Sequence, residues 1–141
     1  MKKIAILFFA IATIVACGSD ALTEKVESKH PNEKPMLVGC YKKIDDKEVR
    51  VAEKHYYDNG KLKMEGNFEN GKRTGIWKAY FNNGQLQSEG VFENGNREGV
   101  GKVYFPNGQL RYEGQYKDNK ETGHWKFYNE KGKLVKEQDF N

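Results

Sequence analysis

Apolar and polar residues alternate along the chain from about Val51 onwards, which is the period of half-buried β-strands. One face of the expected strands carries Leu62, Met64, Gly66, Phe68, Trp77, Ala79 and Phe81, and the other carries Lys61, Lys63, Glu65, Lys78 and Tyr80, with Ile76 as an apolar exception. Glycines after Asn59 leave no stretch with helical period that is long enough for three turns, and each interior glycine costs a helix about 1 kcal/mol. The pattern therefore predicts an all-β fold.

A repeat of 24 residues organises this alternation. The recurring positions are Gly60, Gly84, Gly108 and Gly132; then Leu62, Leu86, Leu110 and Leu134; then Glu65, Glu89, Glu113 and Glu137; and Tyr80, Tyr104 and Tyr128. Repeat proteins bury their apolar faces by stacking one unit on the next. We therefore predict an elongated, single-layer antiparallel β-meander of stacked hairpins over 36–141. It should have about eight strands after Val51 and a degenerate strand near Met36 to Ile44.

Asn-Gly pairs mark the expected hairpin turns. They begin at Asn59, Asn70, Asn83, Asn94 and Asn107. Asn-Gly favours the two-residue type I′ turn, because both central residues of that turn need positive φ. Such a turn at Asn83 would place Trp77 opposite Gly90, Lys78 opposite Glu89, Ala79 opposite Ser88 and Phe81 opposite Leu86. The same construction pairs Lys54 with Glu65, Lys102 with Glu113 and Lys126 with Glu137.

The first residues are typical of an export signal. Lys2 and Lys3 precede an apolar run of 13 residues from Ile4 to Ala16, which is too short to span a bilayer as a helix. The following Cys17-Gly18, after Ile14-Val15-Ala16, resembles the lipobox of bacterial lipoproteins. The resemblance implies a signal peptide over 1–16, a lipidated Cys17 that attaches the protein to a membrane, and a place in the bacterial cell envelope. With Gly18 after the cysteine, it also implies the outer membrane where there are two membranes. An ordinary secretory signal that ends near a cysteine is the alternative.

Residues 17–35 contain charges, serine and two prolines without an apolar period, so we expect a flexible tether. Cys40 is then the one thiol besides the lipidated residue, which excludes an intramolecular disulfide. We expect Cys40 to be a small buried apolar residue, with a reactive or intermolecular thiol as the alternative.

Composition narrows the function further. The 141 residues are enough for one domain, and 24 basic and 20 acidic residues are interspersed, without the basic cluster that nucleic-acid binding requires. His30, His55 and His124 lack the spacing of metal ligands, and Ser88 lacks the sequence of a nucleophile elbow. We therefore predict no catalytic residue, no metal and no cofactor.

The segments 89–101 and 112–116 carry the glutamate, glycine and aromatic positions that resemble the MORN repeat. Met64, Ser88 and Lys136 stand where that family has tyrosine, and this departure resembles the shorter bacterial MORN variant, whose members are often named antitoxins by association. The resemblance implies a non-catalytic scaffold that binds proteins or lipid headgroups. Some plant phosphatidylinositol phosphate kinases carry such repeats beside a catalytic domain, so a kinase name for this chain would reflect the repeats alone.

Aromatic residues of the apolar face form the candidate binding site. They are Trp77, Phe81, Phe92, Phe105, Tyr112, Tyr116 and Trp125. A single-layer sheet has no second layer to cover them, and large exposed apolar patches mark contact surfaces. The alternative is that sheet twist and neighbouring rings shield one another.

Three functions fit these features. The first is a lipid-anchored scaffold whose aromatic face binds a protein partner or a second copy of the chain. The second is a membrane-lipid or glycan adaptor that uses basic residues of the other face, namely Lys61, Lys63, Lys78, Lys102, Arg111 and Lys126. The third is an antitoxin-type protein that neutralises a toxin.

Overall fold

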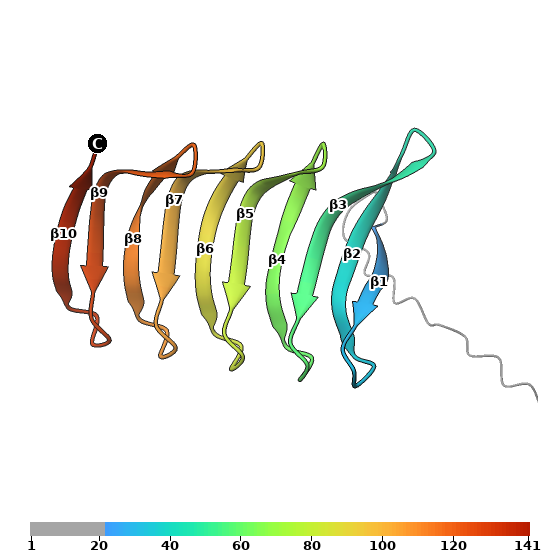
Figure 1. Cartoon of the computed structure of the whole chain (residues 1–141), viewed down its shortest axis with the longest axis horizontal. Helices are drawn as coiled ribbons and strands as arrows, with labels where there is room; N and C mark the ends of the chain where they lie inside the picture. The colour runs from blue at the N-terminus through green and yellow to red at the C-terminus, as the bar shows by residue number, and fades with distance from the viewer. Residues whose placement is uncertain (1–21) are drawn as a thin grey trace, which may run out of the picture.

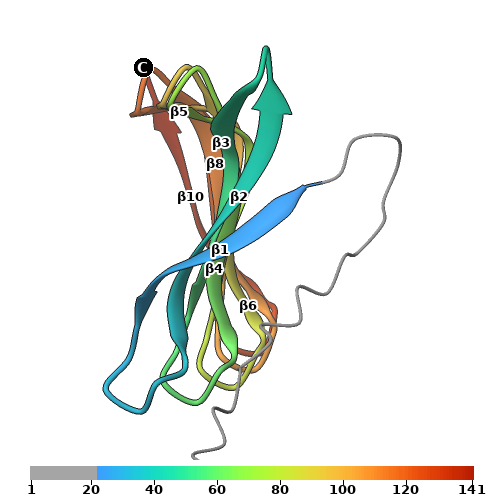
Figure 2. The ribbon, with the colours of Figure 1, turned by 90° about the vertical axis from the view of Figure 1, so that its right-hand side faces the viewer.

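The computed structural model describes residues 22–141, which form one ten-stranded antiparallel sheet whose strands follow in sequence order (Figure 1). The strands are β1 (Thr23–Lys29), β2 (Pro35–Ile44), β3 (Lys47–Tyr56), β4 (Leu62–Glu69), β5 (Lys72–Tyr80), β6 (Leu86–Glu93), β7 (Asn96–Tyr104), β8 (Leu110–Lys117), β9 (Lys120–Tyr128) and β10 (Leu134–Phe140). Seen along the long axis, β4 to β10 lie behind one another in a single layer (Figure 2). Within residues 22–141, no helix is long and apolar enough to span a lipid bilayer.

The predicted fold class is confirmed. Eight strands, β3 to β10, follow the start of the alternating region, and β2 is the degenerate strand expected near 36–44. The flexible tether expected over 17–35 is wrong at 23–29, where β1 pairs with β2. Charged side chains explain why the sequence pattern missed β1, because Glu24 bonds Lys54 at 2.7 Å and Glu27 accepts a hydrogen bond from Tyr41. The predicted signal peptide and Cys17 lie outside the described residues.

Two classes of turn join the strands, one at each end of the hairpins. Three-residue loops connect the strands whose turns contain Gly60, Gly84, Gly108 and Gly132. At the second of these, Phe81 N–H donates to the Gln85 carbonyl and Gly84 N–H donates to the Phe81 carbonyl, both at 2.8 Å. Gly84 has φ of 93°, whereas Asn83 is not among the residues with positive φ. This is a type I turn followed by a left-handed residue, so the predicted type I′ turn is wrong here.

Asparagine is favoured in these three-residue loops for its side chain. Asn83 Oδ1 accepts a hydrogen bond from Gln85 N–H at 2.9 Å, and its amide nitrogen donates to the carbonyl of Pro106 in the next loop. Asn107 makes the equivalent pair of bonds with Gln109 N–H and the Glu130 carbonyl. The asparagine row therefore connects successive turns along one edge of the molecule.

The opposite edge has two-residue turns with positive φ at both central residues, as type I′ requires. Asn70-Gly71 and Asn94-Gly95 are of this kind, which confirms two of the five predicted type I′ turns. Asp118-Asn119 adopts the same conformation without glycine, with φ of 49° and 66°. The 24-residue repeat is therefore one hairpin of each kind.

The strand register is confirmed in the middle of the sheet and corrected near the three-residue loops. Trp77 pairs with Gly90, Lys78 with Glu89 and Ala79 with Ser88 as predicted, but Leu86 pairs with Tyr80 instead of Phe81. The predicted Lys–Glu pairs join into one continuous row across eight strands. That row is Lys54, Glu65, Lys78, Glu89, Lys102, Glu113, Lys126 and Glu137.

Each of the strands β5, β7 and β9 contains a bend near its start. Between β4 and β5 the pairing skips from Glu65–Lys78 to Asn67–Thr74, and Gly75 at this point has φ of 65°. A bulge of this kind bends the strand and increases its twist. The bend is visible where β5, β7 and β9 curve away from the turns that precede them (Figure 1). The sheet is therefore bent near the two-residue turns of each repeat.

Few residues are fully buried, as a single layer requires. The buried hydrophobic residues of the described chain are Val38, Cys40, Trp77 and Trp125. Cys40 is a free, buried thiol among these residues, which confirms the expectation, and its burial raises the pKa of the thiol.

Candidate functional site

The aromatic face, defined here as the sheet face that carries Trp77, Phe92, Tyr112, Tyr116 and Trp125, holds two clusters of rings. The first is centred on Trp77, whose ring centroid lies 5.3 Å from that of Phe68 and 6.1 Å from that of Phe92, both edge-on. The Trp77 indole N–H donates to the Asn67 carbonyl at 3.1 Å. Trp77 retains 4% of its exposure, so it is the core of this cluster and not its surface.

The second cluster is centred on Trp125, which is 1% exposed. Its ring lies 5.1 Å from Tyr116 and 5.7 Å from Phe140, both edge-on, and 6.0 Å from Tyr112. Phe127 completes the cluster, 5.9 Å from Tyr112. Edge-to-face rings at these separations are favourable beyond the area that they bury.

The two clusters share one backbone design. The indole of Trp77 lies on Gly66 of the preceding strand, where a Cβ atom would stand 2.1 Å from the ring. Trp125 lies on Gly114 with the same 2.1 Å separation. The register partner of Trp77 is Gly90, as predicted, but the indole leans toward β4 and packs on Gly66.

The repeat spacing of these features matches a known family. A model of the MORN repeat variant matches residues 52–70, 73–94, 97–118 and 121–141, and a model of the MORN repeat matches 65–76 and 112–126. The chain belongs to the MORN repeat family. Repeats of this family are typical of binding or scaffold proteins and are typically non-catalytic. A search of the curated proteins finds no match to the chain.

Two arginines, which the alternating pattern did not predict, form a second component of the MORN aromatic face. The Arg73 guanidinium lies 4.1 Å from the Trp77 ring centroid and 5.7 Å from that of Phe92. Arg97 lies 5.9 Å from Phe92 and 5.2 Å from Tyr116. Arg73 and Arg97 occupy equivalent positions 24 residues apart, which is the signal that could have identified them.

Between the two MORN clusters the aromatic row is interrupted. Gly101 stands at the position that Trp77 and Trp125 occupy in the neighbouring repeats, 24 residues away on either side. Gly90, the equivalent of Gly66 and Gly114, has no heavy atom within 4 Å of the place where its Cβ would be. A cavity of about 440 Å³ lies here.

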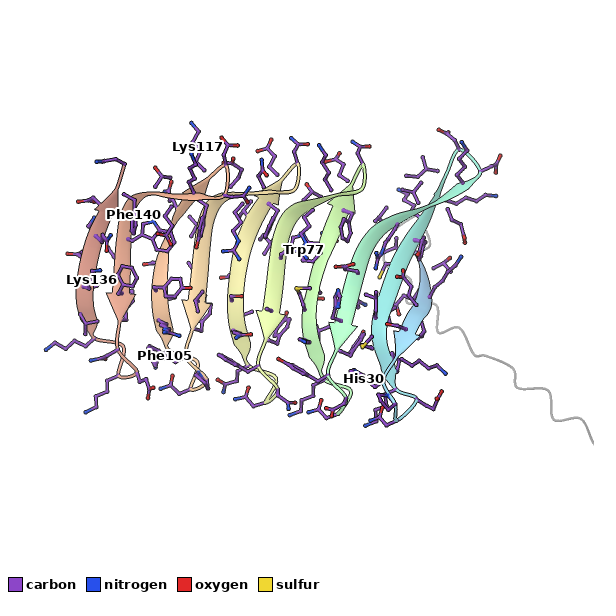
Figure 3. All side chains as sticks on the ribbon, viewed as in Figure 1. His30, Trp77, Phe105, Lys117, Lys136 and Phe140 are labelled. Atoms are coloured by element: carbon purple, nitrogen blue, oxygen red, sulfur yellow. The ribbon has the colours of Figure 1, made fainter. Side chains whose placement is uncertain are left out.

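Phe81 and Phe105 of the predicted site lie at the three-residue loops. Phe105 is seen at the turn end of the sheet, away from Trp77 (Figure 3). Its ring contacts the Arg111 guanidinium at 5.6 Å. The structure therefore brings Phe92, Tyr112 and Tyr116 together with the two tryptophans, while Phe81 and Phe105 flank a different part of the molecule.

The opposite face of the MORN sheet is polar. Tyr80 donates a hydrogen bond to Glu65 at 2.7 Å, Tyr104 donates to Glu89 at 3.0 Å and Tyr128 donates to Glu113 at 3.2 Å. Burial, then the glutamate hydrogen bond, raises the pKa of Tyr80 and that of Tyr104 to about 12. These tyrosines are therefore neutral donors that help to hold the charged row.

Ionisable side chains also meet at the last strand pair. His124 contacts Glu137 at 3.0 Å and Asp139 at 2.8 Å, and these hydrogen bonds raise the pKa of the imidazole. Across residues 22–141, no group of three or more His, Cys, Asp or Glu side chains is arranged to hold a metal ion.

Proposed function

We propose that this MORN protein is a scaffold that binds a protein partner, or a second copy of itself, through its aromatic face. The observation that carries the proposal is the pair of ring clusters on one side of a sheet over which the described residues place no second layer (Figure 2). Aromatic and arginine side chains are the residues enriched at the energetic centres of protein interfaces. The face combines both kinds of residue.

Burial decides which residues a partner would contact. Trp77 and Trp125 are covered by their own neighbours, so they support the surface from below. Phe92, Tyr112 and Tyr116 are half-buried, and Arg97 is exposed. These residues supply the contact, and the tryptophans hold them in place.

A membrane-lipid adaptor fits the polar face less well. Its lysines alternate with glutamates along the row from Lys54 to Glu137, so the positive charge is neutralised every second strand. Anionic lipid surfaces attract clusters of basic residues instead. Ile76, Val91 and Val100 are exposed on this face and form the rival apolar patch.

Site-specific photo-crosslinking distinguishes the two faces. A photoreactive phenylalanine analogue is placed at Phe92 of the aromatic face and, as a matched control, at the adjacent Val91 of the polar face. We expect a protein adduct from Phe92 and little from Val91, and a mass of two chains would indicate self-association. Adducts from Val91 alone, or equal yields from both positions, would contradict the proposal.

We also propose that Cys17 carries a lipid that attaches the scaffold to the bacterial cell envelope, at the outer membrane where there are two. The support is the lipobox-like sequence before Cys17. Because β1 begins at Thr23, six residues after Cys17, the connecting chain reaches at most about 22 Å, so the N-terminal edge of the sheet would lie near the membrane.

Metabolic labelling with a fatty-acid analogue tests the anchor. Label should be lost on Cys17→Ala and retained on Cys40→Ala, the control at the buried thiol. Label that survives Cys17→Ala would refute lipidation at this cysteine.

A further inference from the structure

The cavity over Gly90 has the form of an indole site that the chain itself does not fill. In the two flanking repeats the equivalent site, over Gly66 and over Gly114, holds a tryptophan ring within van der Waals contact of the glycine. Over Gly90 that space is open, because position 101 is glycine and supplies no side chain. Gly66 and Gly114 are buried, whereas Gly90 keeps part of its exposure.

A neighbouring ring does not close this cavity. Tyr116 leans over Gly101, where a Cβ atom would stand 2.8 Å from its ring, and so occupies the space from which a side chain at 101 would start. Tyr116 is held there by Trp125 at 5.1 Å and by Arg97 at 5.2 Å. The ring therefore forms one wall of the cavity and leaves the floor at Gly90 free.

The walls match the chemistry of an aromatic ligand. The Gly90 pocket, as we name this cavity of about 440 Å³, is lined by Trp77, Phe92, Tyr112, Tyr116, Arg73 and Arg97, among other residues. The volume lies within the range of about 300–1,000 Å³ that small-ligand sites have, and the lining combines rings with polar and arginine side chains. Rings that surround an open space offer edge-to-face contacts to a further ring.

The charges around the pocket favour an acidic ligand. Arg73 and Arg97 approach the Phe92 ring at 5.7 and 5.9 Å, so two guanidinium groups flank the opening. Arg111 also lines the cavity. Lys78, Glu89 and Lys102 border the cavity as well, but their side chains belong to the Lys–Glu row of the polar face, where Glu89 accepts the Tyr104 hydrogen bond.

We propose that a partner protein inserts one aromatic side chain, with a carboxylate beside it, into the Gly90 pocket. This inference rests on the proposed function and names the anchor of the interface. The partner's ring would take the place that Trp77 and Trp125 take in their own repeats. Its carboxylate would pair with Arg73 or Arg97 at the rim.

An NMR titration of the isotope-labelled full chain tests the proposal, with the peptide acetyl-Asp-Glu-Trp-Glu-Asp-amide as the probe. We expect saturable shifts of the Gly90 and Gly101 amide signals, while the signals of Gly66 and Gly114 serve as internal controls and stay in place. The same peptide with alanine for tryptophan, or with lysines for the acids, should bind about tenfold more weakly or not at all. Equal shifts at all four glycines, or none, would overturn the proposal.

A variant that fills the pocket gives the second arm. Gly90→Leu directs a side chain into open space, so the fold should persist, whereas Gln115→Leu adds the same side chain on the polar face as a control. Peptide binding should be lost in Gly90→Leu and unchanged in Gln115→Leu. Free indole-3-acetate that binds as tightly as the peptide would instead assign the pocket to a small aromatic acid.

The crosslinking experiment separates this inference from the proposed function. If Gly90→Leu abolishes peptide binding and the crosslink from Phe92, both stand. If the crosslink from Phe92 persists in Gly90→Leu at full yield, the aromatic face binds a partner without the Gly90 pocket, and the inference fails alone. If neither Phe92 nor the peptide reports contact, both fail.

Discussion

The N-terminal strands differ from the repeats that contain Trp77 and Trp125 in the side chain that stands at one equivalent position of the sheet. Glu53, Trp77, Gly101 and Trp125 follow one another at 24-residue intervals. Glu53 is buried, and its carboxylate contacts Arg50 at 2.9 Å and His55 at 3.0 Å, whereas Trp77 and Trp125 gather rings. The strands continue through all four positions. Turns, bulges and backbone pairing therefore set the register, and the side chain at this one row decides what each repeat packs at its centre.

The largest effect should come from the tryptophan that contacts most rings. Trp125→Ala removes an indole that is 1% exposed and should cost about 3–5 kcal/mol of unfolding free energy, because a core aromatic leaves a cavity. Trp77→Ala should cost less, since fewer rings surround it. Urea unfolding followed by circular dichroism measures both. Val135→Ala, at an exposed position, is the control and should change stability by less than about 0.5 kcal/mol.

At the equivalent position of the N-terminal strands, the loss should be electrostatic. Glu53→Gln removes a buried carboxylate from Arg50, which keeps its contact with Glu27 at 3.1 Å. We expect a loss of about 1–3 kcal/mol, the usual penalty of a buried group that loses its charged partner. Glu48→Gln breaks an exposed pair with Lys25 and should cost under about 1 kcal/mol. Equal losses in the same urea assay would show that the burial of Glu53 contributes nothing.

A glycine-to-alanine substitution should have different effects at Gly114, which a tryptophan ring covers, and at Gly90, which no ring covers. Gly114→Ala would push its Cβ to 2.1 Å from the Trp125 ring, so we expect about 1–3 kcal/mol of destabilisation from overpacking. Gly90→Ala has no atom within 4 Å of the new Cβ and should change stability by less than about 0.5 kcal/mol. Thermal unfolding of the two variants gives the comparison. A similar loss in both would mean that the Gly90 pocket is not open in solution.

The sequence predicted the features that recur with its periods. It missed those that depend on side-chain hydrogen bonds and ion pairs between distant residues. Period-two alternation and the 24-residue repeat predict the meander, and the pairs Trp77–Gly90 and Lys78–Glu89 follow from constant register. The turn at Asn83 was misjudged because asparagine there acts through its side chain, not through positive φ. β1 was missed because its charges are satisfied by partners far along the chain, such as Lys54.

The sequence predicted which rings lie on the aromatic face. It did not predict which of them are buried or where the cavity lies. Alternation places Trp77 and Trp125 on the aromatic face, but it cannot show that each leans over the glycine of the preceding strand. That direction is what buries the two tryptophans and leaves Gly90 open. Arg73 and Arg97 were missed because isolated arginines look like solvated charges until the rings beneath them are placed.

The smallest effect on stability should appear at high pH, on the polar face. There the tyrosines of the repeats differ from the equivalent tyrosine of β3 in what raises their pKa. Tyr80 and Tyr104 have pKa values of about 12, raised by burial and by hydrogen bonds to Glu65 and Glu89, while burial raises the pKa of Tyr56. A raised pKa in the folded state means that the protein gains stability from the neutral phenol below pH 10. That contribution is lost as the pH rises through about 12.

Unfolding free energy should therefore fall between pH 10 and pH 12 in the unmodified protein. The fall should be shallower in the double variant Tyr80→Phe and Tyr104→Phe, because two of the shifted phenols are gone. Urea unfolding at successive pH values, with tyrosinate absorbance to follow ionisation, measures the slope. Tyr57→Phe is the matched control, since Tyr57 donates its hydrogen bond to a backbone carbonyl and not to a glutamate. If all three proteins lose stability equally, the Tyr–Glu bonds do not distinguish the repeats, and the polar face is held by the Lys–Glu row alone.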